Sequence, residues 1–383
     1  MRIFKNEEKL SPEYVPPRLP HRDRELSLLE TFFSSYMMGR PAVSVRVLIV
    51  GAVGTGKTAL SKLFGRKLEE SSSLARYIHI NCRIHTTLSS ILKKIVETLG
   101  APIPARGLAA EELGARIVDL LERKRMLIVV GLDEFDGFLH SDPRGVYTLL
   151  RLGEEADREA RISIIAISRN AEILEEMDES VRGVFQAGVI YLEEYDHRQL
   201  ADIVEYRCLE AFYPGVMTEE AKSLITDMAS ERGDARYAVE LLWRAGKYAE
   251  NEGATKVVPE HVRKAAASIY PSIRREVLTY VSRHEKLLLL AAARLLLSSG
   301  KSHISSTELY QAYKVVCEEF GAPARAYTRF WEHMQHLEDL GLIRVKIGKG
   351  ESHGRKSFIT LPGIPASIMV REISALLASA EGE

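Results

Sequence analysis

The stretch GAVGTGKT, residues 51–58, decides the fold of this chain. It matches the pattern GxxxxGK[ST] without gaps, follows the apolar run VRVLIV (45–50) and precedes a helical pattern. In a strand–loop–helix context, glycines let the backbone curl so that its N–H groups point at phosphate oxygens. We predict a site for ATP or ADP, in which Lys57 reaches the β-phosphate and, in ATP, the γ-phosphate, and in which Thr58 binds Mg²⁺. The predicted loop residues are Gly54, Thr55, Gly56, Lys57, Thr58 and Ala59.

A second apolar run, LIVVGLDE (127–134), ends in an acidic pair. We predict that Asp133 lies beside the metal ion and that Glu134 orients or activates a water molecule for attack on the γ-phosphate. Arg236, in GDARYA (233–238), begins a helix and is a candidate contact to the γ-phosphate. Asn170 follows the strand pattern RISIIAIS (161–168), where it either positions the water or merely starts a loop.

Strand and helix patterns alternate through the first half of the chain. The other strand patterns are YIHINC (77–82), MLIVVGLDEFD (126–136) and GVIYLEEY (188–195). This alternation predicts an α/β fold with a parallel sheet and helices on both faces. The length of 383 residues indicates two or three domains. We expect a nucleotide-binding base over 1–194, an all-helical segment over 195–271 and a smaller domain over 272–383.

Composition limits the class of protein. The formal net charge is −1, so nucleic-acid binding would need a local basic patch. Cys82, Cys208 and Cys317 form no CxxC pair, which favours a reducing compartment. The N-terminus lacks the apolar core of a signal peptide, and the apolar run 287–297 is too short to span a membrane. We expect a cytoplasmic, nucleoid-associated protein without a membrane partner.

The last domain shows a helix–turn–helix pattern, with helices over 306–321 and 326–343. The first turn of the second helix carries Tyr327, Thr328 and Arg329, which we expect to meet DNA. Helical spacing predicts that four apolar residues face the core: Phe330, Met334, Leu337 and Leu340.

Two strand patterns follow, and GKGESHGRKS (348–357) lies between them as the predicted tip of a β-hairpin. Residues 322–358 carry seven Lys or Arg and four Asp or Glu, a net charge of +3. A basic, glycine-rich tip suits DNA phosphates and a narrow minor groove. The expected contacts are Lys349, Ser352, His353, Gly354, Arg355 and Lys356.

Over nearly its full length the chain resembles the archaeal origin-recognition/cell-division-control initiator family of AAA+ ATPases. The resemblance rests on YVPPRLPHRDREL (14–26), GAVGTGKTAL (51–60), VVGLDEFD (129–136) and GDARYAVELLWRAGKYAE (233–250), together with the C-terminal pattern. It implies an AAA+ core, a helical lid and a winged-helix domain. It also implies that an N-terminal box wraps the adenine and that Tyr195 and Arg207 line the base. The residues of that box are Val15, Pro16, His21 and Arg22.

The resemblance further implies that the helix pattern over 84–100 touches the DNA backbone. Arg83, Lys93, Lys94 and Arg106 are available there for phosphates. The implied function is ATP/ADP-regulated recognition and deformation of a double-stranded replication origin, with recruitment of the replicative helicase and pairing with a paralogous initiator. Two alternatives stay open: a helicase or clamp loader that remodels a protein ring, and a signalling ATPase whose winged helix binds protein.

Two stretches depart from the family pattern. The family usually has ITN or ISN after the third strand, where this chain has ISRN (167–170), so either Arg169 or Asn170 takes the sensor position. The family usually offers an arginine from LDPRV, where this chain has Ser180 in MDESVRG (177–183), with Arg182 two residues on. We therefore expect slow, regulatory hydrolysis.

Overall fold

The chain divides into two compact units. The sheet unit contains Val15–Gln199 and Gly233–Arg236, and the helical unit contains the remainder. The computed structural model describes residues 2–40, 43–100, 108–152, 161–185, 188–269, 275–349, 355–361 and 364–379. Each unit is described by itself below.

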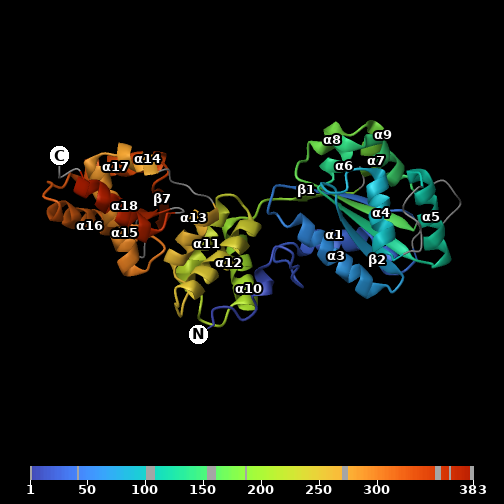
Figure 1. Cartoon of the computed structure of the whole chain (residues 1–383), viewed down its shortest axis with the longest axis horizontal. Helices are drawn as coiled ribbons and strands as arrows, with labels where there is room; N and C mark the ends of the chain where they lie inside the picture. The colour runs from blue at the N-terminus through green and yellow to red at the C-terminus, as the bar shows by residue number, and fades with distance from the viewer. Residues whose placement is uncertain are drawn as a thin grey trace. The chain divides into compact units, whose positions relative to one another are not determined.

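The sheet unit is built on five parallel strands (Figure 1). They are β1 (Arg46–Gly51), β2 (Ala75–Asn81), β3 (Leu127–Asp133), β4 (Ile162–Ser168) and β5 (Val189–Leu192). The order β2-β3-β4-β1-β5 makes β4 the neighbour of both β3 and β1. All five strands lie within the predicted patterns or one or two residues from them, and the predicted α/β class with a parallel sheet is confirmed. Because parallel strands end at the same edge, the loops after β1, β3 and β4 meet there.

Helices cover both faces of this sheet. Alternate residues of β1 point to opposite sides: Val47 and Ile49 join one buried core, and Leu48 and Val50 join the other. The first core is closed by α1 (Asp23–Phe32), α2 (Ser34–Met37) and α3 (Lys57–Ser71). The second is closed by α4 (Leu88–Thr98), α5 (Ala110–Arg123), α6 (Asp136–Ser141), α7 (Pro143–Leu150), α8 (Ile173–Glu176) and α9 (Glu179–Phe185).

The helical unit begins with the N-terminal segment, including the short helix η1 (Glu7–Leu10). Phe4 packs against Phe212 with ring centroids 4.9 Å apart and the rings tilted by 33°, and Glu7 accepts hydrogen bonds from Trp243 and Lys247. The sequence-based division assigns residues 1–14 to the base, whereas their contacts in the structure are with the lid helices. Those helices are α10 (His197–Ala211), α11 (Glu219–Ser230), α12 (Ala235–Asn251) and α13 (Pro259–Ile269).

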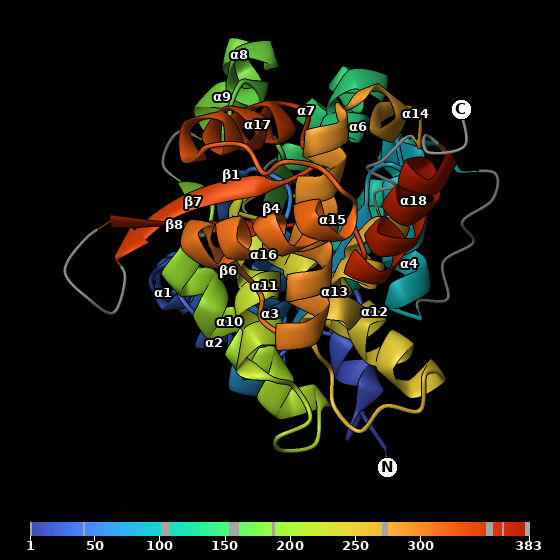
Figure 2. The ribbon, with the colours of Figure 1, turned by 90° about the vertical axis from the view of Figure 1, so that its left-hand side faces the viewer.

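The same unit ends in the predicted winged helix. Its helices are α14 (Arg275–Tyr280), α15 (Arg283–Ser299), α16 (Ser306–Glu319), α17 (Tyr327–Asp339) and α18 (Ala366–Ser379). Figure 2 shows β7 (Arg344–Lys349) and β8 (Arg355–Thr360) running side by side as the predicted hairpin. The short β6 (Ile304–Ser305) pairs with β8. In the part of the chain that the structure describes, no helix is long and apolar enough to cross a membrane.

The second helix of the helix–turn–helix carries one correction. Phe330, Met334 and Leu337 are buried as predicted, but Leu340 is 40% exposed, so its predicted core position is wrong. Leu340 caps the C-terminus of α17. The helical period no longer decides its direction, because the chain turns there.

Two helical glycines of the sheet unit form a matched test of packing. A Cβ at Gly65 would lie 2.2 Å from the ring of Tyr77, whereas a Cβ at Gly183 would have no neighbour within 4 Å. We expect Gly65→Ala to lower the free energy of unfolding by about 1–3 kcal/mol because the tyrosine must move. Gly183→Ala should raise it by up to about 1 kcal/mol through helix propensity. Urea unfolding measures both, and equal effects would contradict the described packing.

Candidate nucleotide-binding site and nucleic-acid interface

At two positions of the loop between β1 and α3, the backbone conformation favours glycine. Gly54 and Gly56 have φ of 80° and 93°, in the left-handed region that side chains disfavour. A Cβ at Gly54 would also lie 1.8 Å from an oxygen of Asp234. Gly56 is the N-cap of α3 and no side chain caps it, so the first N–H groups of the helix remain for an anion.

Lys57 is buried in this loop. Its Nζ donates to the carbonyl oxygens of Gly51 and Ala52, each at 2.7 Å. Burial lowers the pKa of Lys57 to about 8; Asp133 opposes this shift, and the cations Arg169 and Arg236 add to it. A lysine held among cations in this way gains from any anion that enters the loop.

Thr58, in the first turn of α3, and Asp133, at the end of β3, are in contact. The hydroxyl of Thr58 donates to Oδ2 of Asp133 at 2.8 Å, and His79 Nε2 lies 3.4 Å from the same oxygen. Burial alone would raise the pKa of Asp133, but hydrogen bonds from His79 and Thr58 outweigh it and hold the pKa below its usual value. A hydroxyl beside an ionised carboxylate is a fitting donor set for Mg²⁺.

Glu134 sits directly after β3 with φ of 53°, a conformation uncommon for a residue with a side chain. Its two carboxylate oxygens pair with different arginines, Oε1 with Arg169 and Oε2 with Arg83. The side-chain amide of Asn170 donates to Glu172 at 2.7 Å.

Arg22 joins three parts of the site. Its guanidinium, 4% exposed, donates to the carbonyl of Thr55, the hydroxyl of Tyr195 and the carbonyl of Glu193. It also lies 4.0 Å from the ring centroid of Tyr195 and pairs with Glu25. The N-terminal box, the phosphate loop and the residues after β5 are thereby fixed to one another.

The other predicted residues of the N-terminal box lie in different environments. Val15 and Pro16 are buried, and the carbonyl of Val15 accepts a hydrogen bond from Arg66. His21 is exposed and has φ of 63°. Ala59 lies in the first turn of α3. The box thus reaches the phosphate loop through Arg22.

Arg207 belongs to the helical unit, and Tyr195 belongs to the sheet unit. It donates to the carbonyl of Lys9 and lies 5.1 Å from the ring centroid of Tyr14. Burial lowers the pKa of Arg207. The resemblance assigns the side chain of Arg207 to the nucleotide base. In this structure that side chain contacts the N-terminal segment.

Arg236 lies in the first turn of α12, and Gly233–Arg236 belongs to the sheet unit. Its side chain is exposed, and its charge acts on Lys57. Arg182, by contrast, donates to the carbonyls of Glu175 and Met177 and so braces its own segment. Ser180 lies in the same helix, α9.

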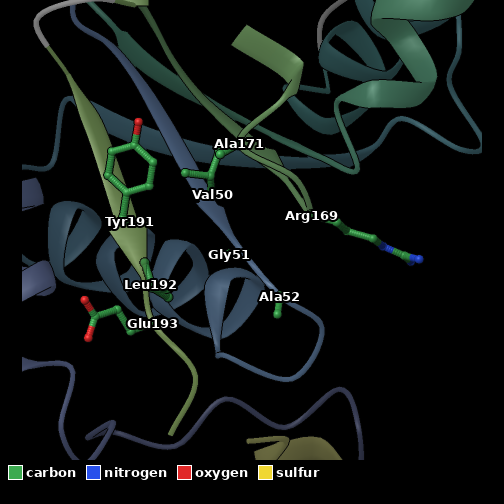
Figure 3. A pocket seen from close by; sticks show the side chains of 8 residues that line it. All are labelled: Val50, Gly51, Ala52, Arg169, Ala171, Tyr191, Leu192 and Glu193. Carbon is green, nitrogen blue, oxygen red and sulfur yellow. The ribbon is translucent and has the colours of Figure 1, made fainter. Parts of the chain in front are cut away.

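An open pocket lies beside the loop, at the carboxyl ends of β1, β4 and β5. Figure 3 shows Arg169 leaving the end of β4 and extending away from Tyr191. The pocket is lined by Val50, Gly51, Ala52, Arg169, Ala171, Tyr191, Leu192 and Glu193. Sequence reasoning did not find the partners His79 and Arg83 for the acidic pair, since no motif marks them.

The candidate nucleic-acid residues fall on three elements. On α4, Lys93 is exposed and Lys94 pairs with Glu97, whereas Arg83, before the helix, pairs with Glu134. On α17, Tyr327 and Thr328 are exposed and Arg329 pairs with Glu332 at 2.6 Å.

On the hairpin, Lys356 is exposed, and the strands place Lys349 opposite Arg355. The tip residues Ser352, His353 and Gly354, and also Arg106, lie outside the described residues. At the base of the hairpin, Arg344 and Lys346 pair with Glu231 and Asp227 of the lid, so part of the local positive charge is balanced within the unit.

Three segments of the chain match models of known protein families. Residues 46–177 match the AAA domain, 201–267 the Cdc6 AAA+ ATPase-type lid domain, and 276–369 the CDC6, C terminal winged helix domain. The chain is 35% identical over 373 residues to ORC1-type DNA replication protein 2 of Saccharolobus solfataricus, covering 94% of this chain and 90% of the relative.

Two solved structures are similar over essentially the whole chain. Cdc6p from Pyrobaculum aerophilum has a TM-score of 0.86 and 29% identity, with 99% of both chains covered. The Aeropyrum pernix ORC1 protein in complex with DNA has a TM-score of 0.64 and 30% identity, with 100% of this chain and 98% of that chain covered.

The pKa of Lys57 leads to a test of phosphate binding. Because it is about 8 in the free protein, charged Lys57 becomes scarcer as pH rises from 7 to 9. Bound phosphate favours the charged form, so binding above pH 8 must take up a proton. We expect ADP affinity to fall by up to about tenfold per pH unit there, with proton uptake visible by calorimetry in buffers of different ionisation enthalpy. Lys57→Arg should remove the dependence; pH-independent binding by the unaltered protein would contradict this.

Proposed function

Because the chain belongs to the family of ORC1-type DNA replication proteins, we propose that it is an ATP/ADP-switched initiator that binds and deforms double-stranded origin DNA. It is an AAA+ ATPase with a Cdc6-type lid and winged helix. The observation that carries the proposal is the presence in one chain of a complete phosphate loop with its acidic pair and of a winged helix with a basic hairpin.

In the proposed reaction, the loop N–H groups and Lys57 hold the phosphates. Thr58 and Asp133 would hold Mg²⁺, which would supply positive charge to neutralise the phosphates. Water adds to the γ-phosphorus and gives a proton to the carboxylate of Glu134. The bond from the γ-phosphorus to the bridging oxygen breaks, and its electron pair leaves with ADP. The 2.8 Å hydrogen bond between Thr58 and Asp133 supports this assignment.

We propose that Arg236 reports the γ-phosphate to the rest of the molecule. It lies in the same unit as the phosphate loop, and its charge acts on Lys57. The helix α12 continues from Arg236 into the helical unit, which starts again at Tyr237. A displacement of Arg236 is thus passed on through the rigid hydrogen bonds of one helix.

The DNA-binding role is proposed for the first turn of α17, the hairpin and α4. Exposed Tyr327, Thr328 and Arg329 stand at the N-terminus of the second helix of a helix–turn–helix, the part that meets base edges in such domains. The A. pernix ORC1 protein, similar over the whole chain, is described in complex with DNA. We also propose origin recognition, a paralogous partner, helicase recruitment and a place in the nucleoid; the support for these is that the relatives are named as DNA replication proteins.

We propose that hydrolysis is slow, and two features of the site support this. Both oxygens of Glu134 are engaged by arginines, and Arg182 is tied to carbonyls of its own segment. We expect a single-turnover rate without partners below about 10⁻² s⁻¹, as for P-loop enzymes without an arginine in trans. Rapid-quench measurement with excess protein tests this. A rate of many turnovers per second would favour a remodelling motor instead.

The hairpin can be tested through the salt dependence of DNA binding. Lys349→Ala with Arg355→Ala should reduce the slope of log affinity against log salt by about two and weaken the preference for origin over scrambled duplex. Lys301→Ala with Arg371→Ala removes the same charge from the same domain outside the hairpin and α17, and should leave the preference intact. Equal behaviour of the two double variants would contradict the role of the hairpin and favour a protein-binding winged helix.

A further inference from the structure

The hairpin of β7 and β8 (Figure 2) carries basic side chains along one face. On β7, Arg344 and Lys346 are two residues apart and therefore project to the same side. The register pairs Gly348 with Lys356, so Lys356 of β8 continues this row. Val345, between the first two, packs against the core of the winged helix, which directs its neighbours away from that core. A row of cations facing outward suits the phosphates of a nucleic acid.

The lid presents two carboxylates to this row. Asp227 lies in the last turn of α11 and Glu231 is its C-cap, four residues on, so both project from one side of the helix. Oδ1 of Asp227 accepts a hydrogen bond from Nζ of Lys346 at 2.6 Å, and Glu231 pairs with Arg344. Two helix positions one turn apart thus match two alternate positions of a strand.

These ion pairs are open to exchange with another anion. The side chains of Arg344 and Lys346 are 40% and 41% exposed, and pairs that water reaches contribute little to stability. A DNA phosphate offers the same charge as a carboxylate. It also releases condensed counterions when a cation neutralises it, which favours the exchange.

Other contacts join the lid to the winged helix. Arg263 of α13 is buried and donates to the carbonyls of Lys301 and Ser302. Glu260, on the same helix, accepts hydrogen bonds from the backbone N–H groups of Ala366 and Ser367 at the start of α18. Because α13 already connects the two domains, the exposed pairs of α11 are not required for that purpose.

We propose that Arg344 and Lys346 form a DNA-phosphate site, which Asp227 and Glu231 of the lid occupy until DNA displaces them. The two acids take the place of phosphates and so lower the affinity of the winged helix for duplex of any sequence, because phosphate contacts carry no sequence information. The site depends on the proposed DNA-binding function of the winged helix, to which it adds two contacts and a restraint by the lid.

Binding of the full-length protein to a duplex of scrambled sequence, measured by fluorescence anisotropy, tests this site. Asp227→Asn with Glu231→Gln keeps the side-chain shapes and removes both charges. It should raise the affinity about fivefold at fixed salt. The same change in a background of Arg344→Gln with Lys346→Gln should have no effect, because no covered cation remains.

The salt dependence identifies the ligand of the two cations. In the protein without the two acids, adding Arg344→Gln and Lys346→Gln should reduce the slope of log affinity against log salt by about two, because two phosphate contacts are lost. An unchanged slope would mean that these cations do not contact phosphates, and it overturns the proposed site.

A matched control comes from the other end of α11. Glu205 and Glu219 both pair with Lys222, so Glu205→Gln with Glu219→Gln also removes two charges from the lid and leaves a cation without its acids. This variant should change the affinity by less than about twofold, since screening by salt limits the effect of distant charges.

The remaining outcomes also decide the matter. A lower affinity without Asp227 and Glu231 means that the acids support the hairpin, and an unchanged affinity means that they do not cover it; either result overturns the site. A rise that persists without Arg344 and Lys346, or an equal rise in the control, reflects net charge alone and overturns it as well. Failure of the proposed function is a separate result, because the unaltered protein would then show no salt-dependent binding to duplex DNA.

Discussion

The buried guanidinium of Arg22 is the contact on which the nucleotide site depends. A buried charge is tolerated only when its hydrogen bonds are made, and removing a partner of such a group typically costs about 3–5 kcal/mol. Arg22 meets this requirement with the carbonyls of Thr55 and Glu193, the hydroxyl of Tyr195 and the carboxylate of Glu25. Three chain segments are therefore held in one arrangement before any nucleotide arrives, which lowers the entropy cost of binding.

The charges around the phosphate loop are arranged for a polyphosphate. Burial, Arg169 and Arg236 lower the pKa of Lys57, while Asp133 and Asp136 act in the opposite direction. One carboxylate lies with Thr58 where a metal ion fits, and the other is restrained by arginines.

The chain passes between its two compact units at four points, after Tyr14, Gln199, Arg232 and Arg236. These points lie next to the N-terminal box, the start of α10 and the segment that carries Arg236. Every covalent route from the nucleotide to the winged helix therefore starts at residues of the candidate site. This connectivity supports the proposal that the winged helix responds to the nucleotide.

The sequence by itself determined the parallel sheet, the phosphate loop, the acidic pair and the winged helix, because periodicity and motif spacing are local properties of the chain. Only the tertiary structure decided which residues meet across the sheet. The order β3-β4-β1 brings Arg169 to Glu134, and the turn after Ser168 sends Asn170 elsewhere. Partners such as His79 depend on strand order and side-chain direction, which no short stretch of sequence records.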